Sequence, residues 1–471
     1  MKILLLQPLV PSNILWGKFA KGEGFVPPIG LLSISAFLRE RGFDVKIKDA
    51  QLEKMTEVDL CNYLKDNKFD VVGIPTFTNS ITFSYYTAEI CRKALPDCKI
   101  IFGGFHASTL PEKTLRECKE IDYIVLSEGE YRMEALLKYF ERKITNLDEI
   151  DGLAYRKNGK IIIQPVINFI KDIDKLPMPA YDLIDMSKYV PHPTQYKVLP
   201  NYPLIIQRGC PYNCAFCGAH TVHGRRVRTK SVENVIKELK VLKKQYGARG
   251  VYFMDSTFLI NRRYIEELLN TMIKEKLNLI WACNTRVDTV DEHILRLMKK
   301  AGCWMIVYGI ESGNQKSLDL LNKRVTVEQS EKAIKITEKV GIIPFCSYIL
   351  CLPGENYDDS LNTVNFALKL KSAIALFYLP VPYPGTELIE ICKKDGGLRE
   401  DTKWEDYSAV DFSNPVYINP LIGKEKMQEL LNSTFRRYYT NPTILIKNIL
   451  SVKSFTDLKK YFIAFKTIFN L

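Results

Sequence analysis

Two long series of short apolar segments that alternate with helical patterns constrain the fold of this chain more than any other feature. In residues 1–150, apolar runs such as Lys2–Gln7 and Val71–Pro75 alternate with amphipathic stretches such as Gly30–Arg41 and Thr82–Ala94. Strands that are apolar on both faces are typical of parallel sheets, whose strands are joined by helical crossovers. The sequence therefore predicts an α/β fold that begins with a doubly wound, mostly parallel sheet and binds ligands at the strands' carboxyl ends.

A second series begins near Tyr202 and contains six predicted strands, each but the last followed by a predicted helix. The predicted strands are Leu204–Gln207, Gly250–Met254, Asn278–Asn284, Met305–Ile310, Ile343–Cys351 and Ala375–Pro380. A full TIM-type barrel has eight such units, so we expect a partial, open (β/α)6 barrel. Active sites on barrels of this kind lie at the carboxyl ends of the strands.

Length and composition divide the chain into four predicted parts. We place the first sheet in residues 1–150 and the barrel in residues 201–395. Residues 151–200 contain an Asn158-Gly159 turn signal and Pro-rich runs, which indicate a linker. Residues 396–471 lose the alternation, and we expect a small helical C-terminal domain there.

Three cysteines lie close together after the first predicted barrel strand, in the run QRGCPYNCAFCGAH. Cys210, Cys214 and Cys217 have the spacing C-x3-C-x2-C. Thiolates that share one loop are typical ligands of iron–sulfur clusters, and three of them leave one iron of a [4Fe–4S] cluster open. The alternative is a zinc site completed by His220 or His223, although zinc usually binds cysteines at C-x2-C spacing.

This motif, with Phe216 before the third cysteine and Gly218 after it, resembles the signature of the radical S-adenosylmethionine (SAM) superfamily. The resemblance covers about residues 200–390. It implies that SAM binds the open iron and is cleaved reductively to methionine and a 5′-deoxyadenosyl radical, which takes a hydrogen atom from the substrate. It also implies cofactor contacts from Phe216 and Gly218, and an electron donor such as a flavodoxin or a ferredoxin.

Polar residues follow the later barrel strands, where the resemblance places contacts with SAM or substrate. Asp255 ends the second predicted strand, Arg286 ends the third, and Glu311-Ser312 ends the fourth. Taken singly, each is better explained by a structural turn or cap, but the set at successive strand ends favours contacts with SAM or substrate. The fifth strand ends in CLPGE, in which Cys351 stands where relatives usually carry Gly.

The first 150 residues resemble the cobalamin-binding module of the B12-dependent radical SAM subfamily. The matching pieces, PPIGL, VGIPTFTNS, GGFHAS and SEGE, follow or approach predicted strand ends. The resemblance implies that cobalamin is a cofactor and that these loops contact it. The predicted contact residues are Thr76, Gly103, Gly104, His106 and Glu128.

The D-x-H-x-x-G motif that supplies a histidine to cobalt is absent at this position. Gly104 stands two residues before His106, and no Gly stands three residues after it. We therefore expect no histidine on the lower face of cobalt. His106 is then either a contact to the corrin or a loop residue that hydrogen-bonds to the backbone.

The leading functional hypothesis is an enzyme that methylates an unactivated carbon of a hydrophobic or lipid-like substrate with the help of cobalamin. One alternative is a radical SAM cyclase or oxidoreductase that binds no cobalamin. A remote alternative is a non-catalytic cobalamin- or nucleic-acid-binding protein. The net charge of +12 is its only support, no nucleic-acid-binding module is visible, and the complete cysteine motif argues against it.

The location of the protein is predicted from its cysteines and its apolar segments. The short apolar start runs into Pro8 without a cleavage pattern, and no apolar stretch is long enough to span a membrane. We therefore expect a cytoplasmic protein with reduced thiols. From Phe435 onward the chain carries seven Lys or Arg residues and one acidic residue. A basic amphipathic helix there either packs on the barrel or contacts the inner face of the membrane.

Overall fold

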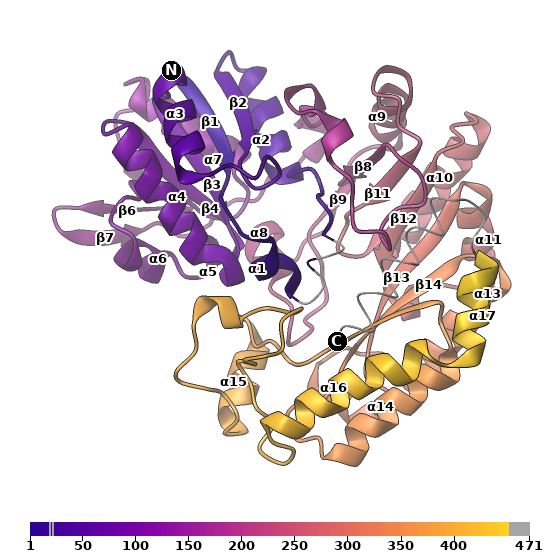
Figure 1. Ribbon diagram of the computed structural model, residues 1–471. Helices are drawn as coiled ribbons and strands as arrows, with labels where there is room; N and C mark the ends of the chain where they lie inside the picture. The colour runs from indigo at the N-terminus through magenta and orange to yellow at the C-terminus, as the bar shows by residue number, and fades with distance from the viewer. Residues whose placement is uncertain (18–19, 21–22, 452–471) are drawn as a thin grey trace. The chain divides into compact units, whose positions relative to one another are not determined.

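The computed structural model describes residues 1–17, 20 and 23–451, and it divides into two compact units (Figure 1). The N-terminal unit comprises Met1–Leu15, Val26–Tyr189 and Gly218–Thr229, and the second unit comprises Trp16–Phe25, Val190–Cys217 and the chain from Lys230 onward. The segment Gly218–Thr229, which follows the third cysteine directly, is therefore part of the N-terminal unit.

The sheet of the N-terminal unit contains seven strands in the order β2-β1-β3-β4-β5-β6-β7. The first five strands in this order are parallel, and β6 and β7 are antiparallel to their neighbours. The bounds are β1 (Lys2–Gln7), β2 (Asp44–Asp49), β3 (Val71–Thr76), β4 (Lys99–Gly104), β5 (Tyr123–Val125), β6 (Leu153–Lys157) and β7 (Lys160–Ile163). From β1, the chain adds β2 on one side of the sheet and then β3, β4 and β5 on the other side. The strand order therefore reverses between β1 and β3, and the ligand crevice is expected at the carboxyl ends of these two strands.

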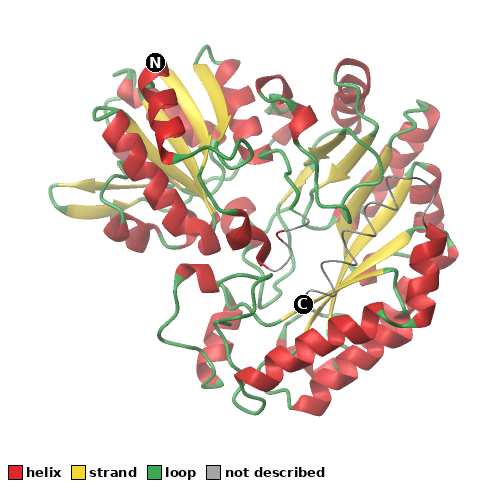
Figure 2. Cartoon of the chain, viewed as in Figure 1, coloured by secondary structure: helices red, strands yellow, loops and turns green. Residues whose placement is uncertain are grey.

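Helices cover both faces of this sheet, which confirms the predicted doubly wound fold (Figure 2). On one face α2 packs against α7, and on the other α3 packs against α4. Both faces of the central strands are therefore buried, as the apolar run at Ile3–Leu6 predicts. The helices are α1 (Ser12–Trp16), α2 (Ile29–Arg39), α3 (Glu57–Asn67), α4 (Ile81–Ala94), α5 (Phe105–Thr109), α6 (Pro111–Glu117) and α7 (Glu130–Phe140), and the segment after the cysteines adds α8 (Ala219–His223) and the short β10 (Arg228–Thr229).

Residues 151–163, which we predicted to lie in a linker, extend this sheet instead. Asn158 and Gly159 have φ angles of 51° and 75°, as a tight hairpin turn requires, and they join β6 to β7. β6 then pairs with β5, with Tyr155 opposite Tyr123. The turn could be predicted because its signal is local. The sheet that the hairpin joins could not, since a short hairpin carries no mark of its partner strand.

The second unit is built on six parallel strands in the order β15-β14-β13-β12-β11-β8, as predicted for a partial barrel. Its core includes a cluster of Trp281, Phe253 and Phe258. The strands are β8 (Asn201–Leu204), β11 (Gly250–Phe253), β12 (Ile280–Thr285), β13 (Cys303–Glu311), β14 (Ile343–Ile349) and β15 (Ile374–Tyr378), with the short β9 (Gln207–Arg208) after β8.

The first predicted barrel strand is interrupted in the structure, for a reason that lies in the neighbouring strand end. The backbone amides of Ile206 and Gln207 donate to the carboxylate of Asp255, at 3.0 and 2.6 Å, instead of continuing a strand ladder. The chain therefore ends β8 at Leu204 and begins the short β9 at Gln207.

The described C-terminal helices pack on the barrel within the second unit. Phe435 of α16 meets Phe377 of the edge strand β15, with 5.5 Å between ring centroids, and the Tyr438 hydroxyl donates to the Ser372 carbonyl at 2.6 Å. Covering an edge strand in this way blocks pairing with another chain. The helices of the unit are α9 (Val232–Gln245), α10 (Arg262–Lys274), α11 (Glu292–Lys300), α12 (Gln315–Leu320), α13 (Val327–Lys339), α14 (Tyr357–Leu370), α15 (Glu387–Lys394), α16 (Lys424–Tyr439) and α17 (Pro442–Ser451).

The predicted basic amphipathic helix in the last part of the chain falls mainly after Ser451 and so lies outside the described residues. Within the described ranges, we find no helix that combines the length and the apolar character needed to cross a membrane.

Candidate active site

The three cysteines lie on the loop that follows β9, and hydrogen bonds to the barrel hold this loop in place. At its centre, the Ala215 N–H donates to the Leu321 carbonyl at 2.8 Å, and the Ala215 carbonyl accepts from the Leu388 N–H at 2.7 Å. The Cys217 N–H closes a turn onto the Cys214 carbonyl at 3.0 Å. All three cysteine residues are partly exposed. The fold of the loop is thus set by the barrel, while none of its cysteines is fully buried.

Phe216, the aromatic residue of the motif, anchors the loop to the barrel core. Its ring packs against a buried cluster that contains Leu321, Leu352 and Leu388. The ammonium group of Lys323 lies 5.4 Å from the centroid of the same ring. The structure therefore gives Phe216 a packing role, and its contact with SAM stays a prediction.

A guanidinium group lies beside the second thiol. Arg286 Nη1 is 3.8 Å from Cys214 Sγ, and the guanidinium carbon is 3.7 Å from the ring centroid of Tyr212. Asp288 orients the guanidinium through two hydrogen bonds of 2.9 Å. Burial raises the pKa of the Cys214 thiol, and the positive charges of Lys323 and Arg286 offset part of this rise. These cations favour the thiolate, which is the form that binds iron.

Only one of the two carboxylate oxygens of Asp255, at the end of β11, accepts hydrogen bonds from the part of the chain that the structure describes. Oδ1 accepts the two backbone amides described above, whereas Oδ2 is buried and has no hydrogen-bond partner among the described residues. Burial raises the pKa of Asp255 to about 7. A buried acceptor without a donor at the mouth of a barrel is suited to a cationic group of a ligand, such as the amino group of SAM.

Replacing Asp255 with asparagine is expected to flatten the pH dependence of stability in the cofactor-free protein. The carboxyl group titrates near 3.8 when unfolded and near 7 when folded, so its stabilising contribution is complete below about pH 4 and is lost as the pH rises through 7. Because one pKa unit is worth about 1.4 kcal/mol, this loss reaches about 4 kcal/mol. Urea unfolding of both proteins between pH 4 and 8 measures it, and parallel curves would contradict the assignment.

The residues at the end of β13 are engaged by neighbours in the same unit. The Glu311 carboxylate pairs with Lys323 at 2.7 Å, and both side chains are buried. The Ser312 hydroxyl lies 3.0 Å from that of Thr363 and accepts the Asn314 N–H at 3.1 Å. Ser312 thus stabilises the strand-end turn, and cofactor contacts from both Glu311 and Ser312 stay predictions. Sequence reasoning missed Lys323, because nothing in LNKR distinguishes it from an ordinary surface lysine.

The CLPGE turn after β14 is organised around a buried carboxylate. Glu355 accepts hydrogen bonds from Ser317 at 2.6 Å, Ser360 at 2.8 Å and the Leu352 N–H at 3.0 Å. The Asn419 amide donates to the carbonyls of Leu352 and Glu355 at 2.8 and 2.9 Å. Glu355 and Asn419 therefore fix the turn from both sides.

Cys351, at the start of this turn, has a φ of 61° and a fully buried side chain. We expect Cys351→Gly to change the free energy of unfolding by less than about 1 kcal/mol. Glycine removes the backbone strain of the positive φ, and this gain offsets the loss of the thiol's packing contacts. Cys351→Val should destabilise by about 2 kcal/mol or more, since a β-branched residue is strained at positive φ and overfills the site. Thermal unfolding of the two variants tests this contrast, and equal effects would contradict it.

In the N-terminal unit, the carboxyl ends of β3 and β4 are joined through one threonine. The Thr76 hydroxyl donates to the Gly103 carbonyl at 2.7 Å and accepts the Ala107 N–H at 3.0 Å. Gly104 has a φ of 93°, and a Cβ added there would lie 2.9 Å from the Thr76 carbonyl oxygen. Thr76, Gly103 and Gly104 therefore shape a tight strand-end loop in which the backbone can approach a ligand closely.

His106 lies inside this unit, with Nδ1 3.3 Å from the Thr78 hydroxyl. Burial, with a smaller effect of Lys113, lowers the pKa of His106 to about 4, so the imidazole is neutral near pH 7. Two aromatic rings instead reach the surface at these strand ends. Phe77 and Phe105 are 47% and 38% exposed, with 6.2 Å between ring centroids. Exposed aromatic surface of this kind suits a large, flat ligand such as a corrin.

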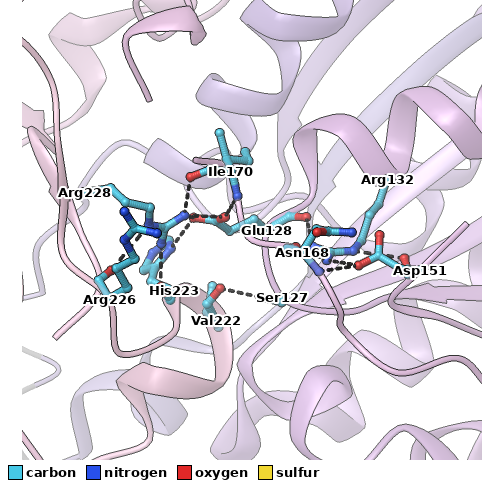
Figure 3. A network of polar contacts seen from close by, with 10 residues as sticks. All are labelled: Ser127, Glu128, Arg132, Asp151, Asn168, Ile170, Val222, His223, Arg226 and Arg228. Atoms are coloured by element: carbon cyan, nitrogen blue, oxygen red, sulfur yellow. Dashed lines mark hydrogen bonds and ion pairs between the residues drawn. The ribbon is translucent and has the colours of Figure 1, made fainter. Parts of the chain in front are cut away.

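Glu128, predicted to contact cobalamin, is paired within the protein instead. Its carboxylate is fully buried and lies 2.8 Å from Arg228 Nη1 and 3.5 Å from His223 Nδ1 (Figure 3). Gly218 is the residue before α8, and its carbonyl accepts the Thr221 N–H at 3.0 Å. Cofactor contacts from Glu128 would require this pairing to open, and those from Gly218 stay a prediction.

No three His, Cys, Asp or Glu side chains of the described residues converge on a single metal-ion position. A [4Fe–4S] cluster is wider than one ion, so its thiolates need not meet at one point. His223, one of the alternative zinc ligands, is engaged with Glu128.

Comparisons with known proteins extend over most of the chain. The radical SAM superfamily model matches residues 204–367, and the B12 binding domain model matches residues 17–137. The chain is 34% identical to an uncharacterized methyltransferase of Pyrococcus horikoshii, over 97% of this chain and 96% of that protein. It is 27% identical to the anaerobic magnesium-protoporphyrin IX monomethyl ester cyclase of Rubrivivax gelatinosus, over 94% of this chain and 78% of that protein.

A solved structure shares the fold along the whole chain. The radical SAM methyltransferase TsrM from Kitasatospora setae matches with a TM-score of 0.73 and 16% identity, and the match covers 99% of both chains. Radical SAM enzymes generally use a small-molecule substrate and a reductant. Both domain models and the full-length methyltransferase relative place the chain in one family. It belongs to the cobalamin-dependent radical SAM enzymes, whose cofactors are a [4Fe–4S] cluster, SAM and cobalamin.

Proposed function

We propose that this enzyme methylates an unactivated carbon of a hydrophobic or lipid-like substrate, with Cys210, Cys214 and Cys217 as the cluster ligands. The observation that carries the proposal is the cysteine loop, in which the barrel fixes the backbone at Ala215 and leaves the three cysteines partly exposed. Three thiolates leave one iron free for SAM. When bound, the cofactors supply one-electron reduction and methyl transfer, while the protein positions them and excludes competing reactions.

The side chains around the loop suit SAM in the second unit. Asp255 offers a buried carboxylate oxygen to a cationic amino group. Arg286, held by Asp288, places a positive charge beside Cys214, and this charge stabilises a thiolate-bound cluster and attracts a carboxylate. The Glu311–Lys323 pair brings a second buried cation close to Phe216.

The loops at the ends of β3 and β4 suit cobalamin in the N-terminal unit. Thr76 fixes the turn at Gly103-Gly104, and no side chain at Gly104 stands between the backbone and a ligand. Phe77 and Phe105 add apolar surface for the corrin. His106 lies inside the unit against Thr78, so we do not assign it to cobalt.

Methyl transfer is favoured over ring formation by the relatives. The methyltransferase relative is the more similar of the two and aligns over almost its whole length. The cyclase relative, whose substrate is a porphyrin ester, supports a large apolar substrate and keeps cyclisation as the second candidate. We place the enzyme in the cytoplasm, with a flavodoxin or ferredoxin as electron donor. We base a proposed contact with the inner membrane face on the seven Lys or Arg residues from Phe435 onward.

Anaerobic purification from cells that take up cobalamin tests this proposal first. We expect about four irons, matching sulfide and about one cobalt per chain. The protein would then be incubated with a reductant, with SAM labelled in its methyl group, and with lipid or porphyrin candidates. Label in a carbon–methyl product supports methyl transfer. An unlabelled, newly cyclised product supports the cyclase. A purified protein that contains iron but no cobalt would rule out any mechanism that uses methylcobalamin.

A further inference from the structure

The segment Gly218–Thr229 links the site to the N-terminal unit through the chain itself. It begins at the peptide bond after Cys217, yet it groups with the N-terminal unit. The segment is short and has only one helical turn at α8, so its own secondary structure cannot hold it rigidly. Its position must therefore come from the residues that contact it.

A buried ion pair between Glu128 and Arg228 is one of these contacts (Figure 3). Arg228 Nη1 lies 2.8 and 3.0 Å from the two carboxylate oxygens of Glu128, and the side chains are 5% and 0% exposed. Glu128 also accepts the Ile170 N–H at 2.8 Å, while Arg228 donates to the Ile170 carbonyl at 2.7 Å and to that of His223. The carboxylate and the guanidinium are thus held by several partners each, and neither is left uncompensated.

Further contacts hold Glu128 in place and join the residue before it to the segment. Arg132 Nη1 donates to the Glu128 carbonyl at 2.9 Å, and Arg132 is itself paired with Asp151 at 2.8 Å. Ser127, whose φ is 63°, directs its hydroxyl to the Val222 carbonyl. The loop between β5 and α7 therefore contacts the segment at two successive residues, Ser127 and Glu128.

We infer that Glu128 is a positioning residue, which together with Arg228 fixes the segment Gly218–Thr229 and thereby the downstream end of the cysteine loop. This inference rests on the proposed role of the three cysteines as cluster ligands. A loop whose downstream end moved would change the placement of Cys217 relative to the other two thiols. The cluster and its response to SAM should then change as well.

The test compares the full-length, cluster-loaded Glu128→Gln protein with the native enzyme. Gln keeps an acceptor for the Ile170 amide but leaves Arg228 without its countercharge. Arg225 and Arg226 are exposed within the segment, so trypsin reports on its opening. We expect cleavage there to be about tenfold faster or more, which corresponds to about 1.4 kcal/mol. We also expect a changed EPR spectrum of the reduced cluster in the presence of SAM.

Two further variants control this experiment. Glu134→Gln removes a carboxylate that pairs with Arg41 at 3.0 Å on α7, away from the segment, and should match the native protein in both readouts. Arg228→Lys keeps the positive charge but loses the second guanidinium nitrogen, which donates to the His223 carbonyl, so it should give an intermediate cleavage rate even if Glu128→Gln fails to fold.

Each outcome decides one part of the inference. Unchanged cleavage in Arg228→Lys and Glu128→Gln would show that the ion pair does not hold the segment. Faster cleavage with an unchanged EPR spectrum would show that the segment does not position the cluster loop. A native protein without iron would overturn the cluster assignment itself, and the inference with it.

Discussion

Cys214→Ala is expected to remove the iron–sulfur cluster and with it the reductive cleavage of SAM. A three-thiolate loop has no spare ligand, so two remaining cysteines hold the cluster weakly. Loss of an outer-shell partner alone lowers metal affinity or activity by about 10–100-fold, and loss of a direct ligand should exceed that range. We expect iron to fall from about four atoms per chain towards zero and SAM cleavage to fall by more than about 100-fold.

A matched control separates the cluster from general effects of thiols. Cys61, on α3 of the N-terminal unit, is also partly exposed, and Cys61→Ser should retain iron and SAM cleavage. Iron and sulfide analysis, the visible spectrum and release of methionine from SAM provide the readouts. If Cys214→Ala kept its iron, another residue would have to replace Cys214 as a ligand, and the C-x3-C-x2-C assignment would be wrong.

Features that depend on local sequence were predictable, and features that depend on distant residues were not. The buried strands of both sheets follow from apolar runs, and the spacing of three cysteines within one loop predicts the cluster ligands. The break between β8 and β9 depends on Asp255, which belongs to the next strand of the sheet. The sheet that accepts the β6–β7 hairpin depends likewise on the exposed edge of β5.

The same distinction explains what sequence reasoning missed at the site. Lys323 meets Glu311 only because the chain returns to β13 after α12. Tyr212 was passed over inside the cysteine motif, since its contact with Arg286 joins two separate strand ends. Glu128 was recognised as a notable residue of the SEGE motif, but its partner Arg228 lies 100 residues along the chain. A polar residue in a motif can therefore be found from sequence before its partner can.

Gly104→Ala is expected to destabilise the N-terminal unit by about 3 kcal/mol and to prevent retention of cobalamin. With φ of 93° and ψ of −170°, Gly104 has a backbone conformation that is essentially restricted to glycine and costs other residues about 1–3 kcal/mol. An added Cβ would also lie 2.9 Å from the Thr76 carbonyl oxygen and 3.0 Å from its nitrogen. Both atoms belong to the backbone of β3, so the strand itself would have to move.

Gly159→Ala is the matched control, because Gly159 also has a positive φ, of 75°, but no atom lies within 4 Å of an added Cβ. It should lose only about 1 kcal/mol, from backbone strain alone. Hydrogen exchange of β3 and β4 in the cofactor-free proteins separates the two variants, and cobalt analysis of the loaded proteins follows the cofactor. Gly104→Ala should exchange faster and lose cobalt, whereas Gly159→Ala should do neither. Equal exchange with loss of cobalt only from Gly104→Ala would place Gly104 against the cofactor itself. Full retention of cobalt by both variants would remove the loop at the end of β4 from the cobalamin site.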